Sequence, residues 1–360
     1  MKRSFFDNLY VNSELKLVAF RFKRFVDGAV KGIRTTPEMR KRFREEIVPY
    51  WKQYGIRPDI NYQKYYSMGD VNKFNKRFIQ NDLWVTKIVP HYNSLLYAQG
   101  FQDKCLHNLF FPGVKRPETL VKNVNGIFYD DQLRLLKKEE AVRILLEYGG
   151  RFIVKPSVGS SQGRGIRFYN SDELTEESVE EIFDRYHRKN FVIQKLLRQH
   201  PDIARLHDKS VNTIRVITFL FRDEVQILST IIRIGNGQNE VDNVAAGGFQ
   251  VNINPDGTLQ KTAYTSRNGK HSFTETNGSG VTFEGYRLPS FDRVIETVKR
   301  MASSLGHFRI VGWDMAVDES GDPVFIEFNC NPGQNQMTYG PTLKEFTDDV
   351  LDEVFGRNGK

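Results

Sequence analysis

Hydrophobic and polar positions follow two different patterns along the chain, and the pattern changes near residue 100. Before that point, apolar residues recur at helical spacing in residues 15–33, 36–55 and 81–100. The first stretch mixes apolar positions with Arg and Lys, which predicts an amphipathic helix with an impure apolar face. The second opens on Thr36 and Pro37, a typical helix start. The N-terminal part is therefore expected to be mostly helical.

Beyond residue 100, short runs rich in Val, Ile and Phe alternate with helical stretches. The expected strands are residues 151–157, 165–170, 190–197, 212–221, 224–235, 249–259, 309–317 and 323–329. The expected helices are residues 139–149, 175–189 and 289–306. Several strand pairs have short connections, so they are expected to form antiparallel hairpins. The pattern predicts an α+β chain and not a doubly wound parallel sheet.

Composition limits the class of protein. The chain has 360 residues, of which 39% are hydrophobic and 27% charged, so it can bury a large core and is not a disordered chain. We expect no membrane span and no secretory signal, because no long apolar run or cleavage site is evident. Two distant cysteines, Cys105 and Cys330, fit a reducing cytosol and exclude a disulfide framework.

Positive charge is concentrated at the N-terminus. The whole chain has a formal charge of +8, and residues 1–60 hold 14 Lys and Arg against 7 Asp and Glu. In residues 15–30, Phe20, Phe22, Phe25 and Val26 stand beside Arg21, Lys23 and Arg24. Such a helix fits an anionic membrane surface, and the alternative is that these phenylalanines pack on the rest of the protein.

The most informative segment is residues 312–333, which holds two strands around the turn sequence DESGDP. If Val317 pairs with Val324, Asp314 lies opposite Glu327, at a spacing where like charges destabilise a sheet. Asn329 shares the face of Glu327. Two facing carboxylates and an amide oxygen on apolar strands favour a Mg²⁺ site.

Two alternatives to this metal site remain open: a hairpin in another register, or acids that face solvent. If the metal site exists, neutralising either Asp314 or Glu327 should abolish activity. Because it relieves like-charge repulsion, the same change should leave the stability of the metal-free protein unchanged or higher.

A glycine- and serine-rich loop follows the strand that ends at Lys155. Gly163 and its neighbouring glycines leave the backbone free to wrap a phosphate, and Ser160 and Ser161 add donors. The loop lacks the Walker pattern and returns into a strand. Lys155 favours a phosphate-binding loop over an ordinary surface hairpin.

Other candidate residues lie within apolar strands. Arg215 and Arg233 are single arginines in such strands, and buried guanidinium groups need anionic partners. The strand that runs into Gln194 and Lys195 has main-chain groups for a purine edge, or is an ordinary buried strand. The seven histidines show no spacing typical of metal ligands.

In this order, these segments resemble the ATP-grasp superfamily, most closely the sugar-transfer-associated ATP-grasp proteins of bacterial surface-polysaccharide biosynthesis. The likeness covers about residues 80–345. The segments that carry it are Asp103-Lys104, Lys155-Pro-Ser with its loop, Gln194-Lys195-Leu-Leu, VNTIRVIT, VDNVAAGGFQVNI and GWDMAV with FIEFNCNPGQNQ.

The resemblance implies a role for each candidate residue. The implied ATP-binding residues are Lys104, Lys155, Ser160, Ser161, Gly163, Gln194, Lys195 and Leu197. The implied ligands of one or two Mg²⁺ ions are Asp314, Glu327 and Asn329. Arg215, Arg233 and Asn243 stand where related ligases contact phosphate or an acyl-phosphate. Gln194 replaces the glutamate that is frequent at this hinge.

The resemblance implies an ATP-grasp fold of two α/β lobes that clamp ATP between antiparallel sheets, with a helical N-terminal extension. The expected division is a basic N-terminal region at 1–95 and an ATP-grasp domain at 96–360, with a nucleotide lobe at 104–197 and a catalytic lobe at 198–350. Residues 1–95 differ from the α/β domain that precedes many such ligases.

The expected activity is a carboxylate–amine ligase that forms an acyl-phosphate and joins an amine or amino acid to a uronic-acid-type carboxylate for capsule synthesis. The alternatives are a related kinase acting on a hydroxyl, or a non-catalytic adaptor for membrane or glycan. We expect a cytoplasmic protein that contacts the inner face of the membrane peripherally; nucleic acid is not an expected partner.

Overall fold

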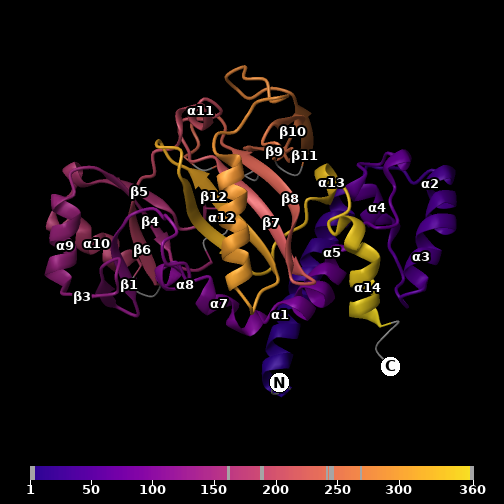
Figure 1. Ribbon diagram of the computed structural model, residues 1–360, viewed down its shortest axis with the longest axis horizontal. Coiled ribbons are helices and arrows are strands. Elements are labelled where there is room, and N and C mark those ends of the chain that lie inside the picture. Colours follow the sequence, from indigo (N-terminus) through magenta and orange to yellow (C-terminus); the bar gives the residue numbers. More distant parts are fainter. Residues whose placement is uncertain are drawn as a thin grey trace.

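The computed structural model describes residues 5–159, 163–186, 190–240, 242, 247–267 and 270–356. In Figure 1, a small sheet with helices α9 and α10 lies at one end, a large sheet occupies the middle, and helices α2, α3 and α4 lie at the other end. Helices and antiparallel sheets occur together, as the α+β prediction expects.

Residues 5–101 are helical, with turns between the helices. The helices are α1 (Phe5–Ala29), α2 (Pro37–Arg42), α3 (Val48–Lys52), α4 (Ile60–Tyr66), α5 (Asn81–Leu83), α6 (Val89–Tyr92) and α7 (Ala98–Phe101), with π turns η1 (Phe43–Ile47) and η3 (Trp84–Ile88) and 3-10 turns η2 (Val71–Lys73) and η4 (Leu95–Tyr97). Thr36 caps α2 as predicted: its hydroxyl accepts a hydrogen bond from Met39 N at 3.2 Å.

Two of the helices expected in this part are interrupted by wider π turns. Each π turn is followed directly by a helix with a proline in its first turn, Pro49 in α3 and Pro90 in α6. Proline has no N–H and its ring clashes with the carbonyl four residues earlier, so the preceding turn widens. Hydrophobic spacing alone does not reveal this interruption. Among the described residues, no helix has the length and apolar character needed to cross a membrane.

The small sheet has the strand order β3-β2-β1-β6-β4-β5, and every neighbouring pair is antiparallel. Its strands are β1 (Thr119–Val124), β2 (Ile127–Tyr129), β3 (Leu135–Leu136), β4 (Arg151–Pro156), β5 (Arg167–Asn170) and β6 (Phe191–Lys195). Helices α9 (Lys138–Glu147) and α10 (Glu176–Arg185) pack on it in one hydrophobic core. The strands β1 to β3 were not predicted: β1 carries Lys122 and Asn123, and β2 and β3 are only three and two residues long.

The large sheet has the order β11-β10-β9-β8-β7-β12-β13, again antiparallel. Its strands are β7 (Thr213–Phe221), β8 (Glu224–Ile234), β9 (Phe249–Ile253), β10 (Leu259–Arg267), β11 (Lys270–Thr274), β12 (Ile310–Val317) and β13 (Pro323–Asn329). The remaining helices are α8 (His107–Phe110), α11 (Pro201–Ala204), α12 (Phe291–Ser304), α13 (Gln336–Tyr339) and α14 (Thr347–Phe355), with 3-10 turns η6 (Ser171–Glu173) and η8 (Lys344–Phe346).

The two faces of the large sheet are covered by different parts of the chain. Val311 and Trp313 of β12 belong to the core formed with α12, which lies across the sheet in Figure 1. Ile310 belongs to a second core, formed with the N-terminal helices and α14. Alternate residues of a strand point to opposite faces, so Asp314 shares the face of Ile310. The polar positions of β12 therefore lie on the face that the N-terminal helices partly cover.

The register of β12 and β13 places Asp314 opposite Glu327, which confirms the prediction. The predicted pairing of Val317 with Val324 is wrong, because Val317 pairs with Pro323. A register shift between Asp314 and Met315 adds one residue on β13 and restores the expected pairing from Asp314 onwards.

Candidate functional site

Asp314 is the centre of a buried ionic network on the large sheet. Its exposed fraction is 1%, and both arginines singled out in the sequence contact it. Arg215 lies opposite it on β7 and donates from Nη2 to Oδ2 at 2.7 Å and from Nε to Oδ1. Arg233 of β8 approaches Oδ1 with Nη2 at 2.8 Å. Burial acts to raise the pKa of Asp314, but the two guanidinium charges outweigh it and lower the pKa.

A second acid, Asp242, extends this network. Its Oδ2 accepts hydrogen bonds from the backbone N of Thr213 at 3.0 Å and from the Thr213 hydroxyl, and lies 3.7 Å from Arg233 Nε. Burial raises the pKa of Asp242 despite the nearby arginine. Sequence reasoning did not single out Asp242 or Thr213, although both lie in segments that carry the family resemblance. The buried arginine thus has the anionic partners that its position requires.

Two lysines lie close to Glu327. Lys104 Nζ forms an ion pair with Glu327 Oε2 at 2.8 Å and lies 3.5 Å from the carbonyl oxygen of Ser157. Lys155, 7% exposed, is near enough to both residues to interact with their charges. Burial, with the like charge of Lys104, lowers the pKa of Lys155 to about 8, although Glu327 acts in the opposite direction. The lysines that the sequence separates by 51 positions therefore meet beside the predicted metal strand.

His107 was dismissed at the level of sequence, yet it lies beside these lysines. Its ring packs against Phe325 and Phe328, with centroids 5.1 and 5.6 Å apart, and its Nε2 atom is buried without a hydrogen-bond partner in the described part of the chain. Burial lowers the pKa of His107, and the charges of Lys104 and Lys155 lower it further. A neutral imidazole therefore adjoins the lysine pair. The spacing of the histidines in the sequence did not predict the position of His107 beside the lysines, because Lys155, Phe325 and Phe328 come from other segments of the chain.

The predicted adenine-side residues lie at the end of β6. Gln194 donates from Nε2 to the carbonyl oxygen of Pro117 at 3.3 Å and to Thr119 Oγ1 at 3.2 Å, and its Oε1 is buried and unpaired within the described residues. Lys195 Nζ forms an ion pair with Glu118 Oε1 at 2.5 Å. Leu197 follows β6 and is half-buried.

Part of the phosphate-loop prediction falls outside the described residues: Ser160 and Ser161, like Asn243 in the other lobe, are not described. Gly163 is described and has φ +75°, a left-handed conformation that favours glycine. Gly165 beyond it has φ +74°, and a Cβ there would lie 2.9 Å from the Pro156 ring. The described part of the loop therefore requires glycine, as expected for a loop whose backbone approaches a ligand closely.

Residues of the N-terminal helices hold the two strands that carry the acids. Asn93, 2% exposed, accepts from the backbone N atoms of Arg309 and Ile310, both at 2.9 Å, and donates to the carbonyl oxygens of Ile310 and Cys330, both at 2.6 Å. Trp84 Nε1 donates to the carbonyl oxygen of Pro332 at 2.8 Å. The start of β12 and the segment after β13 are thus fixed by residues from outside the sheet.

The end of β13 and the segment after it present amide groups that have no partner within the described part of the chain. These buried atoms are Nδ2 of Asn329, Oδ1 of Asn331 and Nε2 of Gln334. Tyr66 of α4 donates to Gln334 Oε1 at 3.2 Å, which places the N-terminal region beside this segment. Buried polar groups in proteins normally have partners, so these amides can accept a ligand or water.

The predicted metal ligands have the chemistry that Mg²⁺ prefers, since Asp314 and Glu327 supply carboxylates and Asn329 an amide. Nowhere in the described part of the chain do three or more His, Cys, Asp or Glu side chains gather as a metal site. In this structure the two carboxylates are neutralised by side-chain cations, Asp314 by two arginines and Glu327 by Lys104. A metal ion bound here would compete with these partners.

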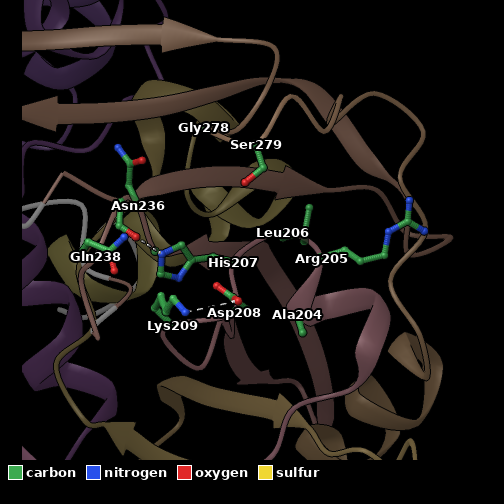
Figure 2. A pocket seen from close by; sticks show the side chains of 12 residues that line it. Ala204, Arg205, Leu206, His207, Asp208, Lys209, Asn236, Gln238, Gly278 and Ser279 are labelled. Carbon is green, nitrogen blue, oxygen red and sulfur yellow. Dashed lines mark hydrogen bonds and ion pairs between the residues drawn. The ribbon is translucent and has the colours of Figure 1, made fainter.

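A separate polar cavity of about 520 Å³ lies beside the end of β8, where its lining includes Gly235, two positions after Arg233 (Figure 2). It lies between residues 204–209, the loop at 235–238 and the turn at 278–279. His207 of the first segment reaches the second, with Nδ1 3.1 Å from Ser210 Oγ and Nε2 3.2 Å from the carbonyl oxygen of Gly237. A Cβ at Gly235 would overlap Ser210 and His207, so this close approach requires glycine. The hydrogen bonds of His207 are internal to the cavity wall.

Comparison with known families identifies the class of protein. The model of the sugar-transfer associated ATP-grasp family matches residues 85–351, so the chain belongs to that family. The match includes every candidate site residue and begins within the last N-terminal helices. It confirms the predicted resemblance and the predicted ATP-grasp fold.

Several solved structures are similar to this chain at low sequence identity. The chain is similar to PsnB (16% identity, TM-score 0.34, 72% of this chain and 62% of that one), to the D-cycloserine synthetase DcsG (14%, 0.42, 72% and 71%) and to D-alanine–D-alanine ligase of Bacillus anthracis in complex with ATP (14%, 0.37, 76% and 68%). It thus spans less than two thirds of the PsnB chain. No curated protein matches significantly. Family membership rests on the family model.

Proposed function

We propose that the protein is an ATP-dependent carboxylate–amine ligase of surface-polysaccharide synthesis, acting in the cytoplasm on a uronic-acid-type carboxylate and an amine or amino acid. The observation that supports it best is the meeting of Lys104, Lys155 and Glu327 beside the strand that carries Asp314. A buried lysine with a lowered pKa, next to a second lysine, is suited to an anionic ligand such as phosphate.

The reaction would have two steps. A carboxylate oxygen of the substrate bonds to the γ-phosphorus of ATP as the bond to ADP breaks, which gives an acyl-phosphate. An amine nitrogen then bonds to the acyl carbon and loses a proton as phosphate leaves. Neither step needs a covalent nucleophile of the protein, so catalysis is positioning and charge neutralisation.

Each residue has a role in this proposal. Lys104 and Lys155 hold phosphates together with the loop of Ser160, Ser161 and Gly163, and the end of β6, from Gln194 through Lys195 to Leu197, lines the adenine. Arg215 and Arg233, with Asn243, bind the acyl-phosphate. Asp314, Glu327 and Asn329 would hold Mg²⁺, which supplies positive charge to the transferred phosphate when bound.

The unpaired amides of Asn329, Asn331 and Gln334 suggest where the acceptor lies. Neutral amides with both donors and acceptors suit the hydroxyl groups of a sugar better than a charged group. Tyr66 contacts Gln334, so the N-terminal helices would form one wall of this site. The helical region would then take the place of the α/β domain that precedes many other ATP-grasp ligases.

The test is release of ADP and phosphate by the full chain with ATP, Mg²⁺ and a panel of uronic acids and sugars without a carboxylate, with and without amines. Hydroxylamine is added in a parallel series, because an acyl-phosphate reacts with it to give a hydroxamate. Hydroxamate that depends on ATP and a uronic acid supports the ligase. ADP without hydroxamate, from a sugar lacking a carboxylate, indicates the kinase alternative. No ADP release with any member of the panel contradicts the proposal for this substrate class.

A further inference from the structure

Helix α1 and the turn η4 form one exposed apolar surface. Among the described residues, eleven large hydrophobic side chains are exposed, and six of them belong to these two elements, which contact each other. We define the α1 surface by these six residues: Leu17, Val18, Phe20, Phe25, Leu96 and Tyr97. Phe20 is the most exposed of them, at 58%. Such a concentration of exposed apolar side chains is typical of interaction sites.

The structure corrects the composition of the apolar face expected from sequence. Val26 is completely buried, and Phe22 packs edge-on against the ring of Tyr65, 6.2 Å away. These two residues belong to the core that α1 forms with α4. Leu17 and Val18 take their place on the exposed side, at 47% and 44% exposure. One side of α1 therefore packs on the protein, as one of the two sequence interpretations expects, and the other side is exposed.

Basic side chains accompany the α1 surface. Lys16, Arg21 and Arg24 are exposed on α1, and the Arg24 guanidinium lies 5.9 Å from the centre of the Phe20 ring. Between residues 13 and 29, where side chains of α1 are described, the one exposed acid is Glu14. The other acid there, Asp27, is bound to Lys23. The surface is therefore apolar and positively charged at once.

We propose that the α1 surface binds the anionic face of a lipid bilayer. Apolar residues interleaved with Arg and Lys are the pattern of helices that lie in the membrane interface, where the rings enter the headgroup region and the cations meet acidic lipids. A second copy of the chain is disfavoured as the partner, since it would bring the same positive charges together. Figure 1 shows the N-terminal part of α1 projecting from one edge of the molecule, beyond both sheets, where a flat surface can reach it.

The test is co-sedimentation of the full chain with vesicles of phosphatidylcholine alone or with 30% phosphatidylserine, at low and high salt. Each Lys or Arg near an anionic surface changes binding by about fivefold, so Arg21→Gln with Arg24→Gln should weaken binding about 30-fold. Leu17→Ser with Phe20→Ser should weaken it at least about tenfold. The matched control is Leu135→Ser with Phe273→Ser, two exposed apolar residues outside this surface, which should bind as wild type does.

The possible outcomes separate the interpretations. Binding that requires phosphatidylserine, falls with salt and is lost in the two α1 variants supports the proposal. A wild-type protein that stays in the supernatant with every vesicle overturns it, as does equal loss in the control variant. A dimer seen by analytical ultracentrifugation without lipid, and abolished by Leu17→Ser with Phe20→Ser, shows that a second copy covers the surface instead. Release of ADP without vesicles is measured on the same variants and should be unchanged, so this test is independent of the proposed reaction.

Discussion

Replacing Lys155 by Met should make the nucleotide-free protein more stable and the enzyme worse. Burial lowers the pKa of Lys155 from its ordinary value of 10.5 to about 8. At 1.36 kcal/mol per pKa unit, holding this amine charged at pH 7 costs the folded state about 3 kcal/mol. Methionine has a similar shape and no charge, so Lys155→Met should raise the free energy of unfolding by up to that amount.

The stability difference between wild type and Lys155→Met should also depend on pH. Below pH 8 the amine is charged in both folded and unfolded chains, so the advantage of the variant is complete. Between pH 8 and 10.5 the folded wild type loses the proton before the unfolded chain does, and wild-type stability rises relative to the variant. The difference between the two proteins should therefore shrink across this range and vanish above it.

The assay is urea unfolding followed by tryptophan fluorescence at pH 7 and pH 10.5, with Lys195→Met as the matched control. Lys195 is about one third exposed and pairs with Glu118, so its loss should change stability by less than about 1 kcal/mol. The same variants are compared by kcat/KM for ATP, where loss of a preorganised phosphate donor costs about 10²–10³-fold. A lower urea midpoint for Lys155→Met at pH 7, or a larger kinetic loss at Lys195, would refute this reasoning.

Three further predictions concern the acids and their supports. Asp314→Asn should abolish ADP production and lower the free energy of unfolding by at least about 3 kcal/mol, because it leaves Arg215 and Arg233 buried without their shared anion. This reverses the expectation from sequence that the metal-free variant is at least as stable as wild type. A metal-free variant as stable as wild type would contradict the prediction. In wild type, the stability that Asp314 contributes should be complete above about pH 4 and disappear as pH falls towards 2, because its folded-state pKa is lowered. Acid unfolding of wild type and Asp314→Asn measures this contribution. Curves of unfolding free energy against pH that stay parallel below pH 4 would count against it. Asn93→Ala should lower the free energy of unfolding by about 3 kcal/mol or more and raise the Mg²⁺ concentration needed for half-maximal ADP release. The reason is that the start of β12 and the segment after β13 lose the side chain that binds both. An unchanged Mg²⁺ dependence would mean that Asn93 contributes to stability alone.

Sequence predicted those features that depend on local periodicity. Because side chains alternate along a strand, Asp314 lies on one face of the sheet and Trp313 on the other. The turn at DESGDP reverses the chain, so Glu327 lies beside Asp314. The family resemblance, carried by short motifs in a constant order, likewise needs no coordinates. The strands β1 to β3, β10 and β11 and the π turns before Pro49 and Pro90 were missed, since the strands are short or rich in polar residues and each π turn is set by a single proline.

Tertiary structure alone decided which charges meet. A pair of facing carboxylates calls for a cation, but nothing local says whether it is a metal ion, an arginine or a lysine. Arg215 and Arg233 reach Asp314 because β7 and β8 follow β12 in the sheet order, and Lys104 reaches Glu327 from a segment more than 200 residues away. Contacts of this kind depend on long-range packing, which hydrophobic periodicity does not predict. For the same reason the sequence showed that α1 is both basic and apolar, whereas only packing decided that Val26 is buried and Phe20 is exposed.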